Sequence, residues 1–219
     1  MNRKIIAFAG SKGAGKSTAF ETLNNNYPNV YDVTLAGHLK EVTAEIYNVD
    51  MQLFLNPKLK EVDLIDPICL EPNQINKLFE LFEVDDFNYD NHVRPHVGKI
   101  LETPRQLLQY LGTNVLHPID PLIHAKYATK HLPKDGLVVI TDLRFEDEFN
   151  FFYKDYKDEF TPFNINNTAA ERAAEDDNHK SETDRHKFKH LCKQLDNNGT
   201  IYQFKGLVKS AVTELYNDK

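Results

Sequence analysis

Gly10-Ser11-Lys12-Gly13-Ala14-Gly15-Lys16-Ser17 matches the GxxxxGK[ST] pattern of a phosphate-binding loop. An apolar run at residues 5–9 precedes it, and a helix-compatible stretch at residues 18–24 follows it, which is the strand–loop–helix context that the pattern requires. The glycines allow backbone N–H groups to surround phosphate oxygens, and the helix N-terminus adds donors and partial positive charge. We therefore expect Lys16 to contact the outer phosphates of a nucleotide and Ser17 to bind Mg²⁺.

Length and composition fit a globular α/β protein. The chain has 219 residues, of which 27% are charged and 41% hydrophobic, enough for one domain with insertions or two small ones. No apolar run reaches the length of a membrane span, and the N-terminus leads directly into the first expected strand. Cys69 and Cys192 are expected to be reduced thiols. These features predict a cytoplasmic protein, in the host cytoplasm if the protein is viral, with no membrane partner.

The net charge of −7 argues against a nucleic-acid partner, because duplex-binding proteins usually carry a basic stripe. The main basic cluster, Arg185-His186-Lys187-Phe188-Lys189-His190, lies within an acidic and polar segment. We interpret it as a solvated helix or a lid. A homodimer is compatible with the sequence.

Strands and helices alternate along the chain. Apolar runs predict strands at residues 5–9, 30–36 and 137–141, with a short last strand at 191–195. Helices are expected at residues 16–26, 39–47, 73–82, 105–115, 120–131, 145–153 and 169–174, and from 200 to the end. This order predicts an α/β fold with three layers, in which a parallel sheet is flanked by helices on both faces.

Two irregular regions interrupt the pattern. Residues 50–102 are rich in proline and acidic residues, and are interpreted as a helical insertion on the core, whose function composition and periodicity do not indicate. Residues 155–190 are polar and weakly periodic, and a lid is expected at about 160–190. Arg172 or Arg185 would enter the site when that lid closes. The whole chain, residues 1–219, is predicted to be a single phosphate-loop domain that carries this insertion and this lid.

The helix expected at residues 105–115 has a clear start and two faces. Thr103 is a candidate N-cap, Pro104 suits the first helical position, and Gln106 would complete a capping box. One face is apolar and the other is polar, with an arginine at its N-terminal end. Gly112 lies at the border, and its cost in a helix, about 1 kcal/mol relative to alanine, indicates close packing or ligand approach. The apolar face consists of Leu107, Leu108, Leu111 and Val115, and the polar face of Arg105, Gln106, Gln109 and Thr113.

A second acidic and basic pair follows the strand at residues 137–141. Ligands of parallel sheets bind beyond the carboxyl ends of the strands, so Asp142 and Arg144 are expected to face the same crevice as the phosphate-binding loop. Asp142 would orient Mg²⁺, its water or the acceptor, with a helix N-cap as the alternative. Arg144 would bind phosphate, with a salt bridge to a neighbouring acid as the alternative. Arg105 and Lys40 are further candidates for phosphate binding.

The sequence resembles the bacteriophage-type deoxynucleoside monophosphate kinases, a branch of the P-loop nucleoside monophosphate kinase superfamily. The resemblance covers nearly the whole chain in order, and the segments 105–113 and 142–144 are its most specific parts. Six segments carry it: the loop with Thr18, Leu35-Ala36-Gly37-His38-Leu39-Lys40, Arg105-Gln106-Leu107-Leu108-Gln109-Tyr110-Leu111-Gly112-Thr113, Val138-Val139-Ile140-Thr141-Asp142-Leu143-Arg144 with Glu148, His179-Lys180-Ser181-Glu182, and Asp196-Asn197-Asn198-Gly199-Thr200.

The resemblance implies transfer of the γ-phosphoryl group of ATP to a deoxynucleoside 5′-monophosphate, with Mg²⁺ as the cofactor. ATP would be held by Gly13, Ala14, Gly15, Lys16, Ser17 and Thr18. The acceptor would be bound by Lys40, Arg105, Gln106, Gly112, Thr113, Asp142, Arg144 and Glu148, and Arg172 would belong to the lid. The residues expected to be catalytic are Lys16, Arg105, Asp142 and Arg144.

Three other functions remain open at this point. A different small-molecule phosphate-loop kinase, such as one resembling dephospho-coenzyme A kinase, would use the same crevice with another acceptor. A nucleic-acid-dependent ATPase is disfavoured by the acidic charge and the short chain. A nucleotide-binding scaffold without turnover is disfavoured because Lys16, Ser17 and Asp142 are all present.

Overall fold

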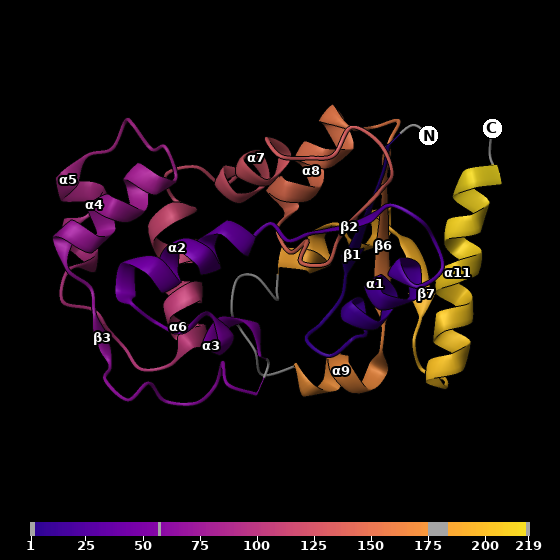
Figure 1. Ribbon diagram of the computed structural model, residues 1–219, viewed down its shortest axis with the longest axis horizontal. Coiled ribbons are helices and arrows are strands. Elements are labelled where there is room, and N and C mark those ends of the chain that lie inside the picture. Colours follow the sequence, from indigo (N-terminus) through magenta and orange to yellow (C-terminus); the bar gives the residue numbers. More distant parts are fainter. Residues whose placement is uncertain (1–2, 57, 175–183, 218–219) are drawn as a thin grey trace. The chain divides into compact units, whose positions relative to one another are not determined.

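The computed structural model describes residues 3–56, 58–174 and 184–217. The chain forms two compact units (Figure 1). Unit 1 contains Met1–Leu35 and His131–Lys219, and unit 2 contains Ala36–Lys130. The predicted insertion at residues 50–102 lies within unit 2, which begins earlier and ends later. No helix in the described part of the chain is long and apolar enough to cross a bilayer.

Unit 1 is built on a five-stranded sheet with the order β2-β5-β1-β6-β7. Every pairing in it is parallel. The strands are β1 (Lys4–Ala9), β2 (Val30–Val33), β5 (Leu137–Ile140), β6 (Phe160–Asn166) and β7 (Lys193–Asp196). The remaining elements of unit 1 are α1 (Lys16–Asn24), α8 (Glu146–Asp155), α9 (Thr168–Ala173), η3 (Asp184–Lys187), η4 (Lys189–Leu191) and α11 (Ile201–Asn217).

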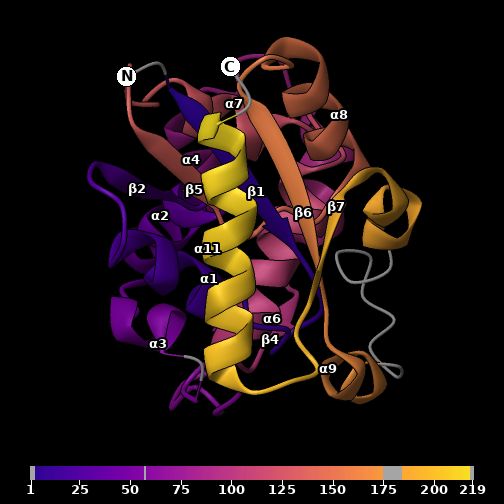
Figure 2. The same cartoon turned by 90° about the vertical axis from the view of Figure 1, so that its right-hand side faces the viewer.

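Helices cover both faces of this sheet. Alternate residues of β1, including Ile6 and Phe8, pack with Leu23 of α1 and Val208 of α11 in one hydrophobic core. Figure 2 shows α1 and α11 side by side on that face. On the other face, the rings of Phe149 and Phe152 in α8 contact Phe160 of β6, the two ring centroids lying 6.2 and 5.5 Å from that of Phe160. The predicted three-layer α/β fold is therefore confirmed.

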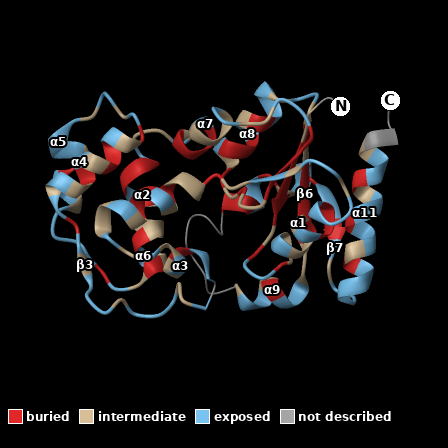
Figure 3. Ribbon diagram, viewed as in Figure 1, coloured by how far each residue is buried: buried red, intermediate tan, exposed pale blue. Residues whose placement is uncertain are grey.

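The three inner strands β1, β5 and β6 are largely buried, whereas the edge strands β2 and β7 and the outer sides of the helices are more exposed (Figure 3). β5 is buried along its whole length, as expected for a parallel sheet covered on both faces. In α11, Phe204, Val208 and Val212 form the buried stripe, whereas Leu207 is 45% exposed.

The interpretation of residues 155–190 as polar and weakly periodic missed a central strand. Residues Phe160–Asn166 form β6, which pairs with β1 on one side and β7 on the other. The range expected to be a lid therefore begins with a core strand, followed by α9. The motif His179-Lys180-Ser181-Glu182 lies outside the described residues.

Unit 2 is mainly helical. Its elements are α2 (Gly37–Tyr47), α3 (Met51–Leu55), β3 (Ile68–Cys69), α4 (Pro72–Leu81), α5 (Tyr89–His92), η1 (Arg94–His96), β4 (Ile100–Leu101), α6 (Pro104–Gln109), η2 (Tyr110–Leu116) and α7 (Ile123–Thr129). It has its own hydrophobic core, which includes Phe54, Leu78 and Leu107. β3 and β4 form a small antiparallel pair.

The helix predicted over residues 105–115 is not α-helical throughout. α6 ends at Gln109, and η2 continues it as a π-helix, in which the N–H of His117 donates to the carbonyl of Gly112. In this wider turn Leu111, Val115 and Leu116 are all buried, so adjacent residues 115 and 116 both reach the core. The expected packing of Leu107, Leu111 and Val115 is confirmed.

Candidate phosphate-binding site

The phosphate-binding loop connects β1 to α1, as predicted. The N-cap of α1 is Gly15, whose φ of 112° lies in the left-handed region that favours glycine. The ammonium group of Lys16 donates to the carbonyl oxygens of Gly10 at 2.6 Å and Ser11 at 2.9 Å. Ser17 is exposed to solvent and Thr18 is half-buried. Ser17 is therefore an exposed residue of the loop, and Lys16 is held against the first residues of the loop.

The loop is supported from behind by the turn that follows β7. The side-chain amide of Asn197 donates to the carbonyl oxygen of Ala14 at 2.7 Å. A Cβ atom at Gly15 would lie 2.6 Å from Nδ2 of Asn197 and 3.1 Å from the ring of Phe204. Glycine at position 15 is therefore required both by backbone conformation and by this close approach.

Asp142 lies at the same edge of the sheet as the loop, as predicted. β5 and β1 are parallel neighbours, with Ile140 paired to Ala7, so their carboxyl ends meet at one edge. Oδ1 of Asp142 accepts the N–H of Leu35 at 2.8 Å, which ties the segment after β2 to the end of β5. The N-cap alternative for Asp142 is wrong, because α8 begins at Glu146 with Phe145 as its N-cap.

Glu148 stabilises the turn between Asp142 and α8. Its Oε2 atom accepts the N–H groups of Arg144 and Phe145, both at 3.1 Å. Its side chain is almost fully buried, and burial raises the pKa of Glu148 to about 8, although the two N–H groups act in the opposite direction. In this structure the Glu148 carboxyl group therefore shapes the turn that carries Arg144.

Arg172 and Arg185, the two lid candidates, lie in different environments. Arg172 is an exposed residue of α9. Arg185 is only 4% exposed, and its guanidinium group donates to Oγ of Ser11 at 2.9 Å and to Oδ1 of Asn164 at 3.2 Å. Arg185 thus contacts the phosphate-binding loop, although the sequence favoured Arg172.

The predicted acceptor residues Lys40, Arg105, Gln106, Gly112 and Thr113 belong to unit 2, whereas Asp142, Arg144 and Glu148 belong to unit 1. The three candidates of unit 1 lie in the segment between the end of β5 and the first turn of α8, whereas those of unit 2 lie on three elements. Lys40 lies on α2, and the other four lie on α6 and η2.

Within unit 2, Arg105 and Gln106 already have partners. Nε of Arg105 donates to Oε1 of Glu61 at 2.5 Å, and Gln106 accepts the N–H of Glu102 at 2.9 Å through its side chain. Thr103 caps α6, as predicted, by accepting the N–H of Gln106 at 3.1 Å. The capping box differs from the prediction, because Gln106 bonds the residue before the cap.

Gly112 owes its presence to packing. A Cβ atom there would lie 3.1 Å from Cδ2 of Leu39 in α2 and 3.5 Å from Nε2 of His124 in α7. The expected close approach is therefore between helices of unit 2.

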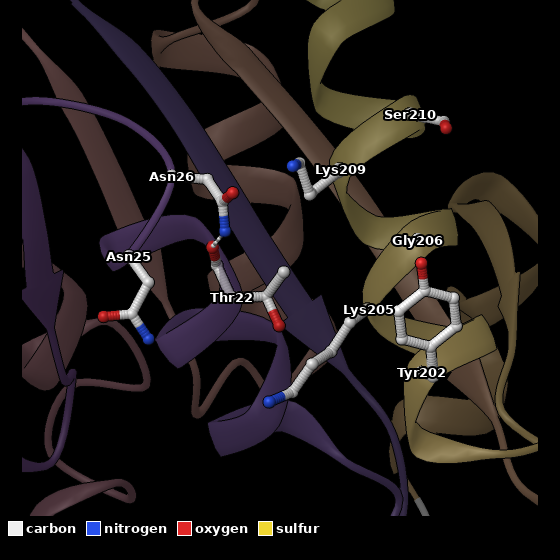
Figure 4. Close-up of a pocket in the computed structure, with 8 residues that line it drawn as sticks. All are labelled: Thr22, Asn25, Asn26, Tyr202, Lys205, Gly206, Lys209 and Ser210. Carbon is white, nitrogen blue, oxygen red and sulfur yellow. Dashed lines mark hydrogen bonds between the residues drawn. The ribbon is translucent and has the colours of Figure 1, made fainter.

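A pocket of about 520 Å³ lies between α1 and α11 (Figure 4). It lies at the C-terminal end of α1, whereas the phosphate-binding loop precedes the N-terminal end. None of its lining residues belongs to the predicted site: Thr22, Asn25, Asn26, Tyr202, Lys205, Gly206, Lys209 and Ser210.

Sequence reasoning missed Asn164 and Ser11 as parts of the site. Asn164 is fully buried in β6, where Nδ2 donates to Asn166 at 2.7 Å and Gln194 at 3.1 Å. The available signal was an asparagine between the apolar residues Phe163 and Ile165, a position where a buried amide needs specific partners.

No protein-family model matches the chain, and no curated protein matches it. Among solved structures, TT1252 from Thermus thermophilus aligns with 98% of this chain and 99% of its own, at 18% identity and a TM-score of 0.39. A dephospho-CoA kinase from Campylobacter jejuni aligns over 97% of both chains, at 12% identity and a TM-score of 0.38.

Proposed function

We propose that the protein is a small-molecule kinase that transfers the γ-phosphoryl group of ATP to a deoxynucleoside 5′-monophosphate. The observation that carries the proposal is the loop from Gly10 to Ser17 at the same sheet edge as Asp142 and Arg144. Phosphoryl transfer needs little covalent chemistry from the protein, and depends on placement and on neutralisation of charge. A loop lysine, an acidic residue at the end of a neighbouring strand and a following arginine meet that need.

The residues fit a magnesium nucleotide. Ser17 is an exposed residue at the start of α1, and Asp142 follows β5, so a hydroxyl and a carboxylate, the ligand types that a hard cation or its waters prefer, come from the same edge of the sheet. When bound, Mg²⁺ would neutralise charge on the outer phosphates. The ammonium group of Lys16 is already held at the loop by two backbone carbonyl oxygens. When a nucleotide binds, phosphate oxygens would replace these two partners.

The acceptor is assigned on the resemblance and on Arg105, Gln106, Gly112 and Thr113 in α6 and η2. Arg105 is half-buried and ion-paired with Glu61, so its guanidinium group is oriented before an acceptor phosphate arrives. Gln106 is uncharged, and its side-chain oxygen accepts the backbone N–H of Glu102. Within this segment the acceptor phosphate therefore depends mainly on Arg105.

The first experiment is to measure ADP formation by the purified protein with Mg-ATP and a panel of deoxynucleoside and ribonucleoside monophosphates. Dephospho-coenzyme A and single-stranded DNA are tested as separate additions. Activity that requires a deoxynucleoside monophosphate and yields its diphosphate supports the proposal. Activity with dephospho-coenzyme A alone would replace the acceptor, and stimulation by DNA alone would replace the function.

Replacing Arg105 tests the acceptor assignment directly. Arg105→Ala is expected to raise the KM for the acceptor by about tenfold or more, since a charged hydrogen-bonding partner is lost, with little change in the KM for ATP. Steady-state kinetics with each substrate varied separately measure this. Arg94→Ala, which removes an exposed arginine of unit 2, is the control. Equal effects on both substrates would contradict the assignment.

A further inference from the structure

Arg185 is a buried cation that contacts both the phosphate-binding loop and the sheet. Its side chain is about 5% exposed, and the Glu171 carboxylate, 3.8 Å from the guanidinium group and 40% exposed, is the ion-pair partner found in the described part of the chain. Its Nε atom is buried and has no hydrogen-bond partner among residues 3–56, 58–174 and 184–217. A buried charge is costly unless it is paired and hydrogen-bonded. The hydrogen bonds of its guanidinium group are made by the two terminal nitrogens.

The two terminal nitrogens of Arg185 join the loop to the sheet. NH2 donates to the hydroxyl of Ser11, and NH1 donates to the side-chain oxygen of Asn164 in β6. Asn164 is in turn fixed by Asn166 and Gln194, so the far end of this chain of hydrogen bonds is anchored in β6 and β7. Ser11 is 2% exposed, which makes its hydroxyl a poor contact for solvent or substrate.

Ser11 is also a partner of the loop lysine. Its carbonyl oxygen accepts from the ammonium group of Lys16 at 2.9 Å and from the N–H of Ala14 at 3.0 Å. When Lys16 turns toward a bound nucleotide, Ser11 loses that contact. The bond from Arg185 does not involve Lys16, so it can keep Ser11 in place in both states.

We propose that Arg185 is a positioning residue that holds Ser11, and with it the phosphate-binding loop, in the conformation that binds nucleotide. This inference rests on the proposed function, and it differs from the expectation that a lid arginine swings in to touch the transferred group. Preorganisation of this kind raises affinity by reducing the ordering that binding requires. Removing it should therefore weaken donor binding and leave acceptor binding unchanged.

The test is a double-mutant cycle on the affinity for MgADP, measured by calorimetry. Arg185→Lys keeps the charge but lacks the fork, and Ser11→Ala removes the acceptor oxygen. Each single substitution is expected to raise the dissociation constant for MgADP by about tenfold. The dissociation constant of the double variant should be no more than about twofold higher than that of the single variant that binds MgADP less tightly. Arg94→Lys, an exposed arginine paired with Asp90, is the matched control and should bind normally.

Three further readouts separate positioning from structural support. The KM for ATP should rise in both single variants while the KM for the acceptor stays the same. Urea denaturation measures the free energy of unfolding of Arg185→Lys. Ser11→Ala breaks the same hydrogen bond by removing a single oxygen atom, so it tests the inference even if Arg185→Lys is destabilised. Additive losses, or lower stability with unchanged MgADP affinity, would overturn the inference. If the unsubstituted protein binds no MgADP, the proposed function fails, and the inference fails with it.

Discussion

Glu148 illustrates how one buried side chain links a turn to pH. Two backbone N–H groups satisfy its Oε2 atom, yet burial dominates and raises the pKa to about 8. The neutral form is therefore favoured in the folded protein, relative to an ordinary value of 4.5. The resulting stabilisation is full below about pH 4.5 and is lost as the pH rises through about 8, at roughly 1.4 kcal/mol per pKa unit.

Glu148→Gln is predicted to remove this dependence. Glutamine keeps a side-chain oxygen for the N–H groups of Arg144 and Phe145 but does not titrate. The free energy of unfolding of the unsubstituted protein should fall relative to that of the variant between pH 4.5 and 8. Urea denaturation of both proteins across this range is the measurement. Parallel profiles would mean that the carboxyl group of Glu148 does not titrate differently on folding.

Lys16 carries the second prediction for a single residue. Lys16→Ala should lower kcat by about 100-fold or more, because the outer phosphates lose a preorganised cation. Lys77→Ala, which removes an exposed lysine paired with Glu80 in unit 2, is the control. Circular dichroism checks that both variants are folded. Near-normal turnover by a folded Lys16→Ala protein would remove the loop from the mechanism.

Elements whose reason is local were predictable from the sequence, and those whose reason is tertiary were not. The phosphate-binding loop, α1 and β5 follow from glycine positions and a continuous apolar run. β6 has the sequence Phe-Thr-Pro-Phe-Asn-Ile-Asn, whose polar residues do not indicate a buried strand. Asn164 can be buried there because Gln194 and Arg185, which are distant in sequence, form hydrogen bonds with its side chain. The contact of Arg185 with Ser11 likewise depends on the fold.

The π-helical turn was also beyond the reach of periodicity. A 3.6-residue repeat predicts the faces of residues 105–115, but not the i to i+5 bond between Gly112 and His117. Only the packing of Gly112 against Leu39 and His124 makes the position distinctive. In α6 and η2, the sequence therefore predicted which residues are candidates for the site, but not the π-helical backbone that carries some of them.

Two helical glycines test this packing argument. Gly112→Val should lower the free energy of unfolding by about 1–3 kcal/mol, because added atoms meet Leu39 and His124. Gly206→Ala is the matched comparison, since nothing lies within 4 Å of its added Cβ, and it should raise stability by about 0.5–1 kcal/mol. Denaturation midpoints and slopes measure both. Equal effects would show that packing does not explain Gly112.

At the scale of the whole molecule, the residues proposed to bind ATP lie in unit 1, and those proposed to bind the acceptor lie in both units. At 100 times its dissociation constant, MgADP should stabilise the unit that binds it by about 2.7 kcal/mol. We expect it to slow hydrogen exchange of backbone amides in β1 and β5. A deoxynucleoside monophosphate should slow exchange in α6. Protection of α6 by MgADP alone, or no protection of β1, β5 or α6 by either ligand, would contradict the proposed binding residues.

Unit 1 is interrupted in sequence by unit 2, and this has a consequence for synthesis of the chain. On one side β1 pairs with β5, and on the other with β6, so Ile5 finds its partners at Val138 and Phe160. Unit 2 is continuous, and all of its residues leave the ribosome before either partner of β1 does. Pairings so distant in sequence form slowly. The strand that precedes the proposed nucleotide loop thus lacks both neighbours until residues 137–166 have been synthesised, so the proposed binding of ATP is expected only after that stage.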